Sequence, residues 1–150
     1  MRFELDWRSR EAGPLQTPRR FLDYIVDGES LYDELGFDLV SPLGWGLAEN
    51  SAARRLLQKL PPDVDDRVAV YVCPEDADLL CGSITVKIRR DGDDVVWTGL
   101  AYSTYDVVDD CWRHDSSGLP HWDELRFPAT AYHDAIEHRP AFAPLAGQAP

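Results

Sequence analysis

The chain has 150 residues, of which 44% are hydrophobic and 11% aromatic, and this predicts one globular domain, 1–150, rather than a disordered chain. The formal net charge of −12 argues against direct nucleic-acid binding, because that affinity comes from Lys and Arg side chains that neutralise phosphates. No apolar run approaches the ~20 residues that a membrane-spanning helix needs, so no contact with a membrane is expected.

The N-terminal segment mixes charged and apolar residues and has no apolar core, so no secretory signal is expected. The three cysteines are an odd number without dense spacing, which argues against a disulfide-stapled secreted domain. We therefore expect a cytoplasmic protein. Cys73 and Cys81 lie close enough in sequence to pair across a loop, but spacing alone does not establish the geometry of a disulfide.

Apolar and polar residues alternate over residues 2–8, which predicts a first strand with one buried face. Residues 21–26 predict a second strand. After it, residues 27–28 (Asp-Gly) permit either a hairpin or a turn into a short helix. We prefer the helix, because Ser30 can cap its start and Gly36 can end it.

Residues 37–46 are irregular and place Trp45 between two glycines. Such an aromatic residue either fills one end of the core or belongs to a binding surface, and we expect the first. A helix then runs from a cap at Asn50 or Ser51 to Leu60, where two prolines end it. It should cover one face of the sheet with an apolar stripe formed by Ala53, Leu56, Leu57 and Leu60.

Three consecutive strands are predicted over residues 67–106. The first, 67–73, is apolar on both faces and should be central in its sheet. In the second, 83–90, Ile84, Val86 and Ile88 should face the core, whereas Ser83, Thr85, Lys87 and Arg89 should face water. An Asp-Gly pair in the next connection favours a tight turn into the third strand.

Together these elements predict an α+β fold, with an antiparallel sheet of about four to five strands and two to three helices packed mainly on one face. The centre of the sheet is the antiparallel meander 67–105. A short strand near residues 125–127 and a helix capped by Thr130 should follow. The Ala/Pro-rich tail 141–150 is expected to be flexible.

The loop after the first meander strand carries two of the three cysteines. Its segment YVCPEDADLLCG, together with LDYIVDGESLYDELG and DGDDVVWTG, resembles a family of small, acidic, uncharacterised actinobacterial proteins over residues 18–105. In that family the loop tends to run Cys-Pro-Glu-Cys-x-Asp-Leu-x-Cys-Gly. The resemblance implies no established function, although members are sometimes loosely labelled oxidoreductases. Here Asp76 stands at the position of the family's second cysteine.

A Cys-x-x-Cys spacing would suit a redox pair or half of a zinc site. Asp76 removes the two-thiol reaction at this spacing, but Cys73, Asp76 and Cys81 still offer sulfur, oxygen and sulfur ligands. His114 or Cys111 would complete a set of four. One predicted function is therefore a metal-binding protein, with zinc as its cofactor, or a thiol-redox protein. The simpler interpretation makes the cysteines small buried apolar residues at strand ends.

Evidence for catalysis is otherwise thin. Four histidines and three cysteines permit a Cys–His pair, but no nucleophile elbow, phosphate loop or nucleotide fingerprint accompanies them. Residues 133–138 place two acid–histidine pairs at i,i+4 spacing, which ordinary surface pairs explain. We therefore name no catalytic residue and favour a protein that is not an enzyme.

The acidic charge is uneven: residues 1–60 contain ten acids and eight bases, and residues 61–150 contain seventeen acids and seven bases. In a meander, the loops 63–66 and 91–94 would lie at one end and 74–80 at the other. These ends would attract a basic partner, or would serve only solubility. The candidate binding residues are Asp63, Asp65, Asp66, Glu75, Asp76, Asp78, Asp91, Asp93, Asp94 and Trp112.

Exposed aromatic side chains such as Tyr102, Tyr105 and Trp112 would add contact area between these ends. Calcium is a weaker option, because the acidic turns lack an EF-hand loop. The preferred prediction is a non-enzymatic acidic binding module without a cofactor, which neutralises a basic protein in the manner of an immunity protein.

Overall fold

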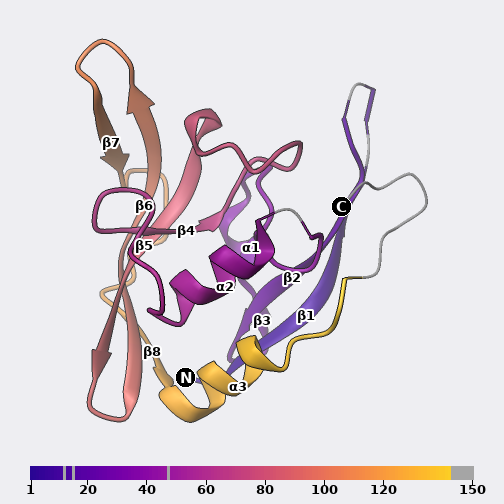
Figure 1. Ribbon diagram of the computed structural model, residues 1–150, viewed down its shortest axis with the longest axis vertical. Coiled ribbons are helices and arrows are strands. Elements are labelled where there is room, and N and C mark those ends of the chain that lie inside the picture. Colours follow the sequence, from indigo (N-terminus) through magenta and orange to yellow (C-terminus); the bar gives the residue numbers. More distant parts are fainter. Residues whose placement is uncertain (12, 15, 47, 143–150) are drawn as a thin grey trace.

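The computed structural model describes residues 1–11, 13–14, 16–46 and 48–142, which form an α+β fold with two antiparallel sheets (Figure 1). The smaller sheet has the order β1-β2-β3, with β1 at Phe3–Arg10, β2 at Arg19–Val26 and β3 at Glu29–Ser30. The larger sheet has the order β4-β5-β6-β7, and β8 pairs with β6 beside this path. Its strands are β4 (Val68–Tyr71), β5 (Ser83–Asp91), β6 (Asp94–Asp106), β7 (Cys111–Asp115) and β8 (Leu125–Pro128).

Helices complete the fold. They are α1 (Leu31–Leu35), α2 (Glu49–Leu56), α3 (Ala129–Glu137) and the short 3-10 helix η1 (Leu79–Cys81). α1 packs on β2 and α2 on β4, while α3 contacts β1, β6 and β8 and so joins the two sheets. Over the described ranges, no helix has the length and apolar character needed to cross a membrane.

The α+β class and the antiparallel meander are confirmed by the pairing of β4, β5 and β6. The short helix after β2 is confirmed as well. Ser30 Oγ accepts a hydrogen bond from Asp33 N at 3.2 Å, and Gly36 ends α1 with a φ of 72°. The hairpin alternative is also present in a minimal form, because residues 29–30 pair with β2 as β3.

The start of α2 differs from the prediction. The helix begins at Glu49, after Ala48 with a φ of 58°, so neither Asn50 nor Ser51 caps it. It ends at Leu56, which leaves Leu60 outside the helix. The Glu49 carboxylate instead accepts hydrogen bonds from Gly44 N and from Arg139 Nε, so tertiary contacts hold this end.

α3 also begins without the predicted cap. It follows Pro128, and Thr130 lies within the helix rather than before it. The amide of Ala129 donates to Asp93 O at 2.8 Å, which satisfies a backbone group that a side-chain cap would otherwise serve. Of the predicted tail 141–150, residues 143–150 lie outside the described part of the chain.

β4 is buried on both faces as predicted, but it is not central, since it lies at one end of the strand order. Its outer edge is nevertheless covered. Val40 and Val72 exchange backbone hydrogen bonds of 3.0 and 2.7 Å just beyond the strand. The apolar pattern of β4 therefore predicts that the strand is buried, but it does not predict where the strand lies in the sheet.

The predicted exposure of Ser83 and Thr85 is wrong, because both side chains are fully buried. Thr85 Oγ1 lies 2.8 Å from Ser103 Oγ on β6. His114 on β7 contacts Ser103 and also Asp65, so β7 and the loop before β4 cover this face of the sheet. The bond to Ser103 satisfies the buried hydroxyl of Thr85, whereas Ser83 Oγ has no hydrogen-bond partner within the described residues, so its burial is not explained in this way.

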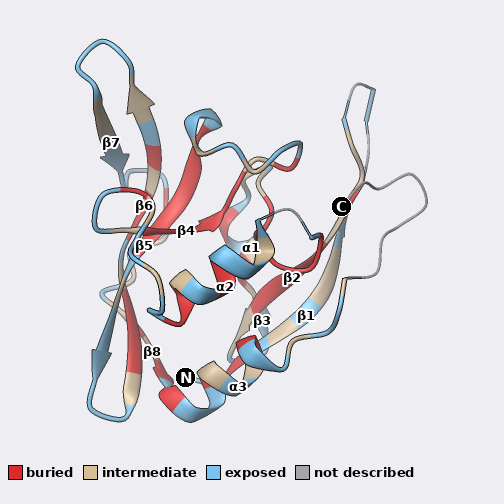
Figure 2. Cartoon of the chain, viewed as in Figure 1, coloured by how far each residue is buried: buried red, intermediate tan, exposed pale blue. Residues whose placement is uncertain are grey.

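An aromatic cluster fills the core, where Figure 2 colours much of β2, β4 and β6 as buried. Trp97 is 1% exposed, and its ring centroid lies 5.3 Å from that of Tyr24 and 5.4 Å from that of Phe127. Trp97 Nε1 donates to Tyr132 Oη at 3.2 Å, and this hydroxyl donates to Leu56 O at 2.7 Å. One tryptophan thus links β6, α3 and the end of α2.

Trp45 belongs to the core, as expected. Its side chain is fully buried, and its Nε1 donates to Ser41 O at 2.8 Å. The guanidinium group of Arg19 lies 4.1 Å from the centroid of the Trp45 ring. The irregular segment 37–46 is therefore anchored by its aromatic residue and does not present it to solvent.

Asp23 on β2 is a buried carboxyl group at the junction of the two sheets. Its Oδ1 accepts hydrogen bonds from Tyr71 Oη of β4 at 2.5 Å and from Tyr24 N at 2.9 Å. Its Oδ2 accepts from Ser30 Oγ at 2.5 Å. Burial raises the pKa of Asp23, although these hydrogen bonds and the charge of Arg8 oppose the shift.

Candidate functional site

The loop between β4 and β5 brings together three of the predicted metal ligands. Cys73 Sγ, a carboxylate oxygen of Asp76 and Cys81 Sγ all lie within 4.8 Å of one another. Cys73 is half-buried, whereas Asp76 and Cys81 are exposed, so an ion can reach the three groups from solvent. In Figure 1 this loop lies in the upper part of the molecule, away from the β5–β6 turn.

The local sequence explains why Cys81 returns to Cys73. Ala77 N donates to Cys73 O at 3.0 Å, which closes a first turn, and Ala77 adopts a φ of 60°. Asp76 Oδ1 then accepts from Asp78 N at 3.0 Å, and Asp78 Oδ1 accepts from Leu80 N at 2.9 Å. Short acidic side chains that bond the backbone two residues ahead thus fold the loop back on itself.

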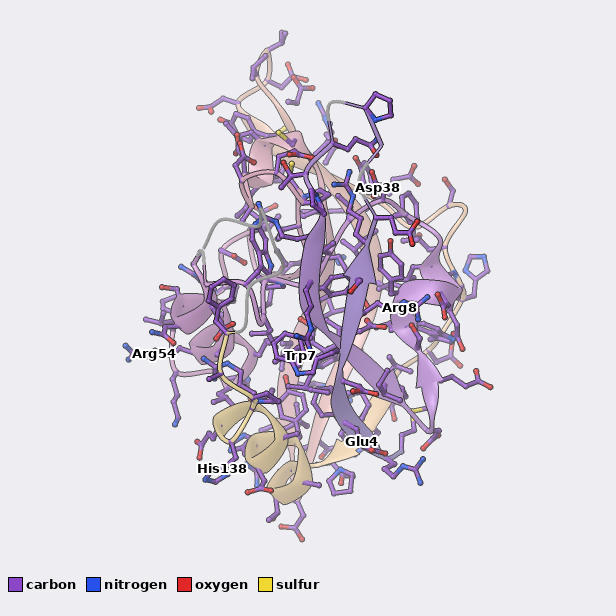
Figure 3. The ribbon with its side chains drawn as sticks, turned by 90° about the vertical axis from the view of Figure 1, so that its right-hand side faces the viewer. Glu4, Trp7, Arg8, Asp38, Arg54 and His138 are labelled. Carbon is purple, nitrogen blue, oxygen red and sulfur yellow. The ribbon has the colours of Figure 1, made fainter. Side chains whose placement is uncertain are left out.

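Arginines of the smaller sheet hold the loop from behind. Arg19 on β2 donates to Pro74 O at 2.8 Å and to Glu75 O at 3.1 Å. Arg10 on β1 is 6% exposed and pairs with Glu75 at 3.3 Å and with Asp38 at 2.7 Å. Asp38 is labelled in Figure 3 near the upper part of this sheet. The position of the loop therefore depends on the contact between the two sheets.

Gly82 closes the loop at a place where no side chain fits. It has a φ of 102°, and a Cβ atom there would overlap the hydroxyl group of Tyr102. Tyr102 is itself half-buried and stacks on Phe37 with ring centroids 5.4 Å apart. Tyr102 is thus a support of the loop rather than an exposed binding aromatic.

The charges around Cys81 resist loss of its proton. Desolvation by its immediate neighbours and the nearby Cys73, Asp78 and Asp76 raise the pKa of the exposed Cys81 thiol. Asp78 Oδ2 lies 3.9 Å from Cys81 Sγ, in reach of a weak hydrogen bond. A thiol with a raised pKa is a poor nucleophile near neutral pH, whereas a divalent cation would offset the clustered negative charge and displace the proton.

The separation of the three groups is close to what zinc needs. With Zn–S bonds of about 2.3 Å and tetrahedral geometry, ligand atoms lie about 3.8 Å apart. The ligand atoms lie within 4.8 Å of one another, so side-chain rotations that bring them about 1 Å closer would reach this spacing. Water or the Asp78 carboxylate would supply a fourth ligand.

His114 and Cys111 do not join this cluster within the described residues. His114 Nδ1 lies 2.7 Å from Ser103 Oγ, and His114 Nε2 lies 2.8 Å from Asp65 Oδ2. This Ser-His-Asp arrangement was not predicted, since no spacing links Asp65 to β7. Because Ser103 is fully buried and also contacts Thr85, a substrate has no access to its hydroxyl group, and the network is structural.

The nine predicted acidic binding residues do not form one uncompensated edge. Asp65 is in contact with His114. Asp76 and Asp78 bond the backbone of their own loop. Asp93 has no ion pair within the described residues. Basic side chains of the protein pair with the other five. The pairs join Asp63 to Arg55 (3.9 Å), Asp66 to Lys87 (3.5 Å), Glu75 to Arg10 (3.3 Å), Asp91 to Arg126 (2.9 Å) and Asp94 to Arg126 (3.1 Å).

No protein-family model, curated protein or solved structure matches this chain. The resemblance to the actinobacterial family therefore stays a prediction, and so does everything that it implies about the loop. The chemistry of the site has to be inferred from its own side chains.

Proposed function

We propose that the protein binds a divalent metal ion of the zinc class through Cys73, Asp76 and Cys81. The observation that carries this proposal is the approach of two thiols and one carboxylate to within 4.8 Å in an accessible loop. Thiolates favour zinc and other soft ions over magnesium and calcium, which prefer oxygen ligands. The ion would cross-link the end of β4 to the start of β5.

Metal binding accounts for this loop better than thiol catalysis does. Asp76 removes the second thiol of a Cys-x-x-Cys pair, and the raised pKa of Cys81 lowers its nucleophilicity at neutral pH. The same carboxylates that disfavour a thiolate in the free protein favour a bound cation. Acid would weaken binding, because Cys81 has to lose its proton to become a ligand.

The test is the metal content and zinc affinity of protein purified without chelator. We expect one zinc ion per chain, and we expect Cys73→Ser or Cys81→Ser to weaken zinc binding by about 100-fold or more. Asp76→Ala should weaken it by about tenfold. Competition with a chromogenic chelator measures each affinity, and thiolate absorption of the cobalt form identifies the ligands.

Cys111→Ser is the matched control, because Cys111 lies outside the cluster. It should leave the zinc affinity unchanged. Failure to bind zinc at micromolar concentration, or an equal loss in Cys111→Ser and Cys73→Ser, would overturn the proposal.

A second candidate is the acidic binding module that neutralises a basic protein. It is favoured by the β6–β7 hairpin, which extends away from the body in Figure 1 and exposes Val107 and Val108 by 79% and 87%. Asp106 Oδ1 accepts hydrogen bonds from Val108 N at 2.9 Å and Asp109 N at 3.1 Å, so the turn is ordered. An ordered apolar tip flanked by carboxylates suits an apolar pocket rimmed by Lys or Arg.

We expect joint substitution Val107→Ser and Val108→Ser to weaken binding of such a partner by about 100-fold, because two central apolar contacts are lost. Photo-crosslinking from position 108 identifies the partner, and titration calorimetry with the purified partner measures the affinities. Asp134→Asn on α3, an exposed acid outside the predicted binding residues, is the control and should change the affinity less than about threefold. Equal affinities of the parent and the double variant would exclude the hairpin as the contact.

A further inference from the structure

A cavity of about 390 Å³ lies beyond the end of α2, between residues 55–62 and strands β4 and β5. This volume is within the range of pockets that hold small molecules. Val68 and Ile88 contribute to its apolar wall, and Arg55 and Lys59 contribute its charges. The lining contains no carboxylate, although the chain as a whole has a net charge of −12. The charged side chains of the lining are thus both cations, and their carboxylate partners, Asp63 and Glu137, lie outside the lining.

Arg55 enters the cavity with unused donors. Its Nε donates to Pro61 O at 3.2 Å and lies 3.9 Å from Asp63 Oδ2, too far for a good hydrogen bond. Within the described residues, neither terminal guanidinium nitrogen donates a hydrogen bond. The side chain is 28% exposed, so its terminal nitrogens remain accessible to a ligand that enters from solvent. A planar fork of this kind prefers a carboxylate or phosphate group.

A bend after α2 brings a second cation to the same cavity. Gln58 adopts a φ of 60°, which is unfavourable for a residue with a side chain, and its Nε2 donates to Ile88 O at 3.3 Å. Lys59 N donates to Arg54 O at 2.7 Å and completes the bend. Lys59 Nζ pairs with Glu137 at 2.9 Å, which leaves two of the three ammonium protons for another acceptor.

We propose that this cavity binds a small amphipathic anion. Its carboxylate or phosphate group lies between Arg55 and Lys59, and its short apolar chain packs against Val68 and Ile88. A neutral ligand without an acceptor would leave the terminal nitrogens of Arg55 without a hydrogen bond from the ligand. The net charge of −12 disfavours a polyanion such as nucleic acid more than a small anion, because repulsion grows with the number of charges brought to the surface. This site is independent of the proposed metal site.

The test titrates octanoate and octyl phosphate into the full chain, with binding measured by calorimetry and mapped by amide chemical shifts. Both should bind saturably and shift the amides of Val68 and Ile88, and the tighter ligand identifies the preferred headgroup. Octanol and acetate, which each lack one half of the ligand, should bind at least about tenfold more weakly. Arg55→Gln and Lys59→Gln should each weaken octanoate or octyl phosphate by about tenfold.

Arg54→Gln is the matched control, since Figure 3 shows Arg54 on the same helix at the edge of the molecule, directed into solvent. It should bind both anions like the parent. Thermal unfolding shows whether Arg55→Gln folds. If it does not, Lys59→Gln tests the site, because Lys59 is exposed and its replacement should not disturb the fold. Absence of saturable binding, shifts confined to other residues, or undiminished binding by Lys59→Gln would overturn the proposal.

Discussion

Replacement of Trp97 by alanine should lower the free energy of unfolding by about 4 kcal/mol, which is a large fraction of the stability of a domain of this size. Trp97 is 1% exposed and packs edge-on against Tyr24, Phe127 and Tyr132. Removal of the indole leaves a cavity that the two rigid sheets cannot close. It also leaves the hydroxyl group of Tyr132 without its donor.

Urea unfolding followed by far-UV circular dichroism measures this effect, with Trp112→Ala as the matched control. Trp112 lies half-buried on the β6–β7 hairpin, where it contacts Tyr105 at a ring separation of 5.2 Å. Its loss should cost about 1 kcal/mol, since it creates no enclosed cavity. Similar losses for the two variants would show that Trp97 is not the centre of the core.

Asp23→Ala should lower the free energy of unfolding by about 3 kcal/mol, because buried donors of Tyr71, Ser30 and Tyr24 lose their acceptor. Asp23→Asn keeps most of these contacts and isolates the charge. Burial raises the pKa of Asp23 in the folded protein, so the folded state retains this proton to a higher pH than the unfolded chain does. The contribution of Asp23 to stability is therefore full below about pH 4 and is lost as the pH rises through the folded pKa.

The stability of Asp23→Asn relative to the parent should accordingly rise over that interval. Asp38→Asn provides a control of opposite sign. Arg10 lowers the pKa of Asp38, so the contribution of Asp38 is present above about pH 4 and is lost as the pH falls through its folded pKa. Urea unfolding at several pH values measures both differences. A pH-independent difference for Asp23→Asn would contradict the buried, proton-retaining carboxyl group.

Local signals carried much of the fold prediction. The capping pair Ser30 and Gly36 and the Asp-Gly turn act over a few residues, and each is confirmed. Alternation along β5 located the strand but assigned the wrong exposure to Ser83 and Thr85. The pairing of β1 with β2 was not predicted, because the connection between them lacks a tight-turn signature. The burial of Ser83 was not predicted either, because it depends on β7 and on a distant loop that cover the strand.

In the candidate site, too, residues close in sequence were easier to predict than residues brought together by the fold. Cys73, Asp76 and Cys81 belong to one short loop, so the sequence could name them together as possible ligands, and the structure shows that they lie close to one another. His114 lies on another strand, and its position depends on the register of β6 with β7, where it is opposite Ser103. No local pattern reports that register. The exclusion of His114 from the cluster therefore required the tertiary structure.

The contact of β1 with α3 has a consequence for biosynthesis. Phe3 lies 5.0 Å from Phe127 and 4.7 Å from Tyr132 between ring centroids, so the buried face of β1 is completed only by residues made much later. At about 5–20 residues per second, on the order of ten seconds separate their emergence from the ribosome. During that interval the apolar face of β1 lacks its partners Phe127 and Tyr132, so we expect the N-terminal hairpin to be completed only after α3 has emerged.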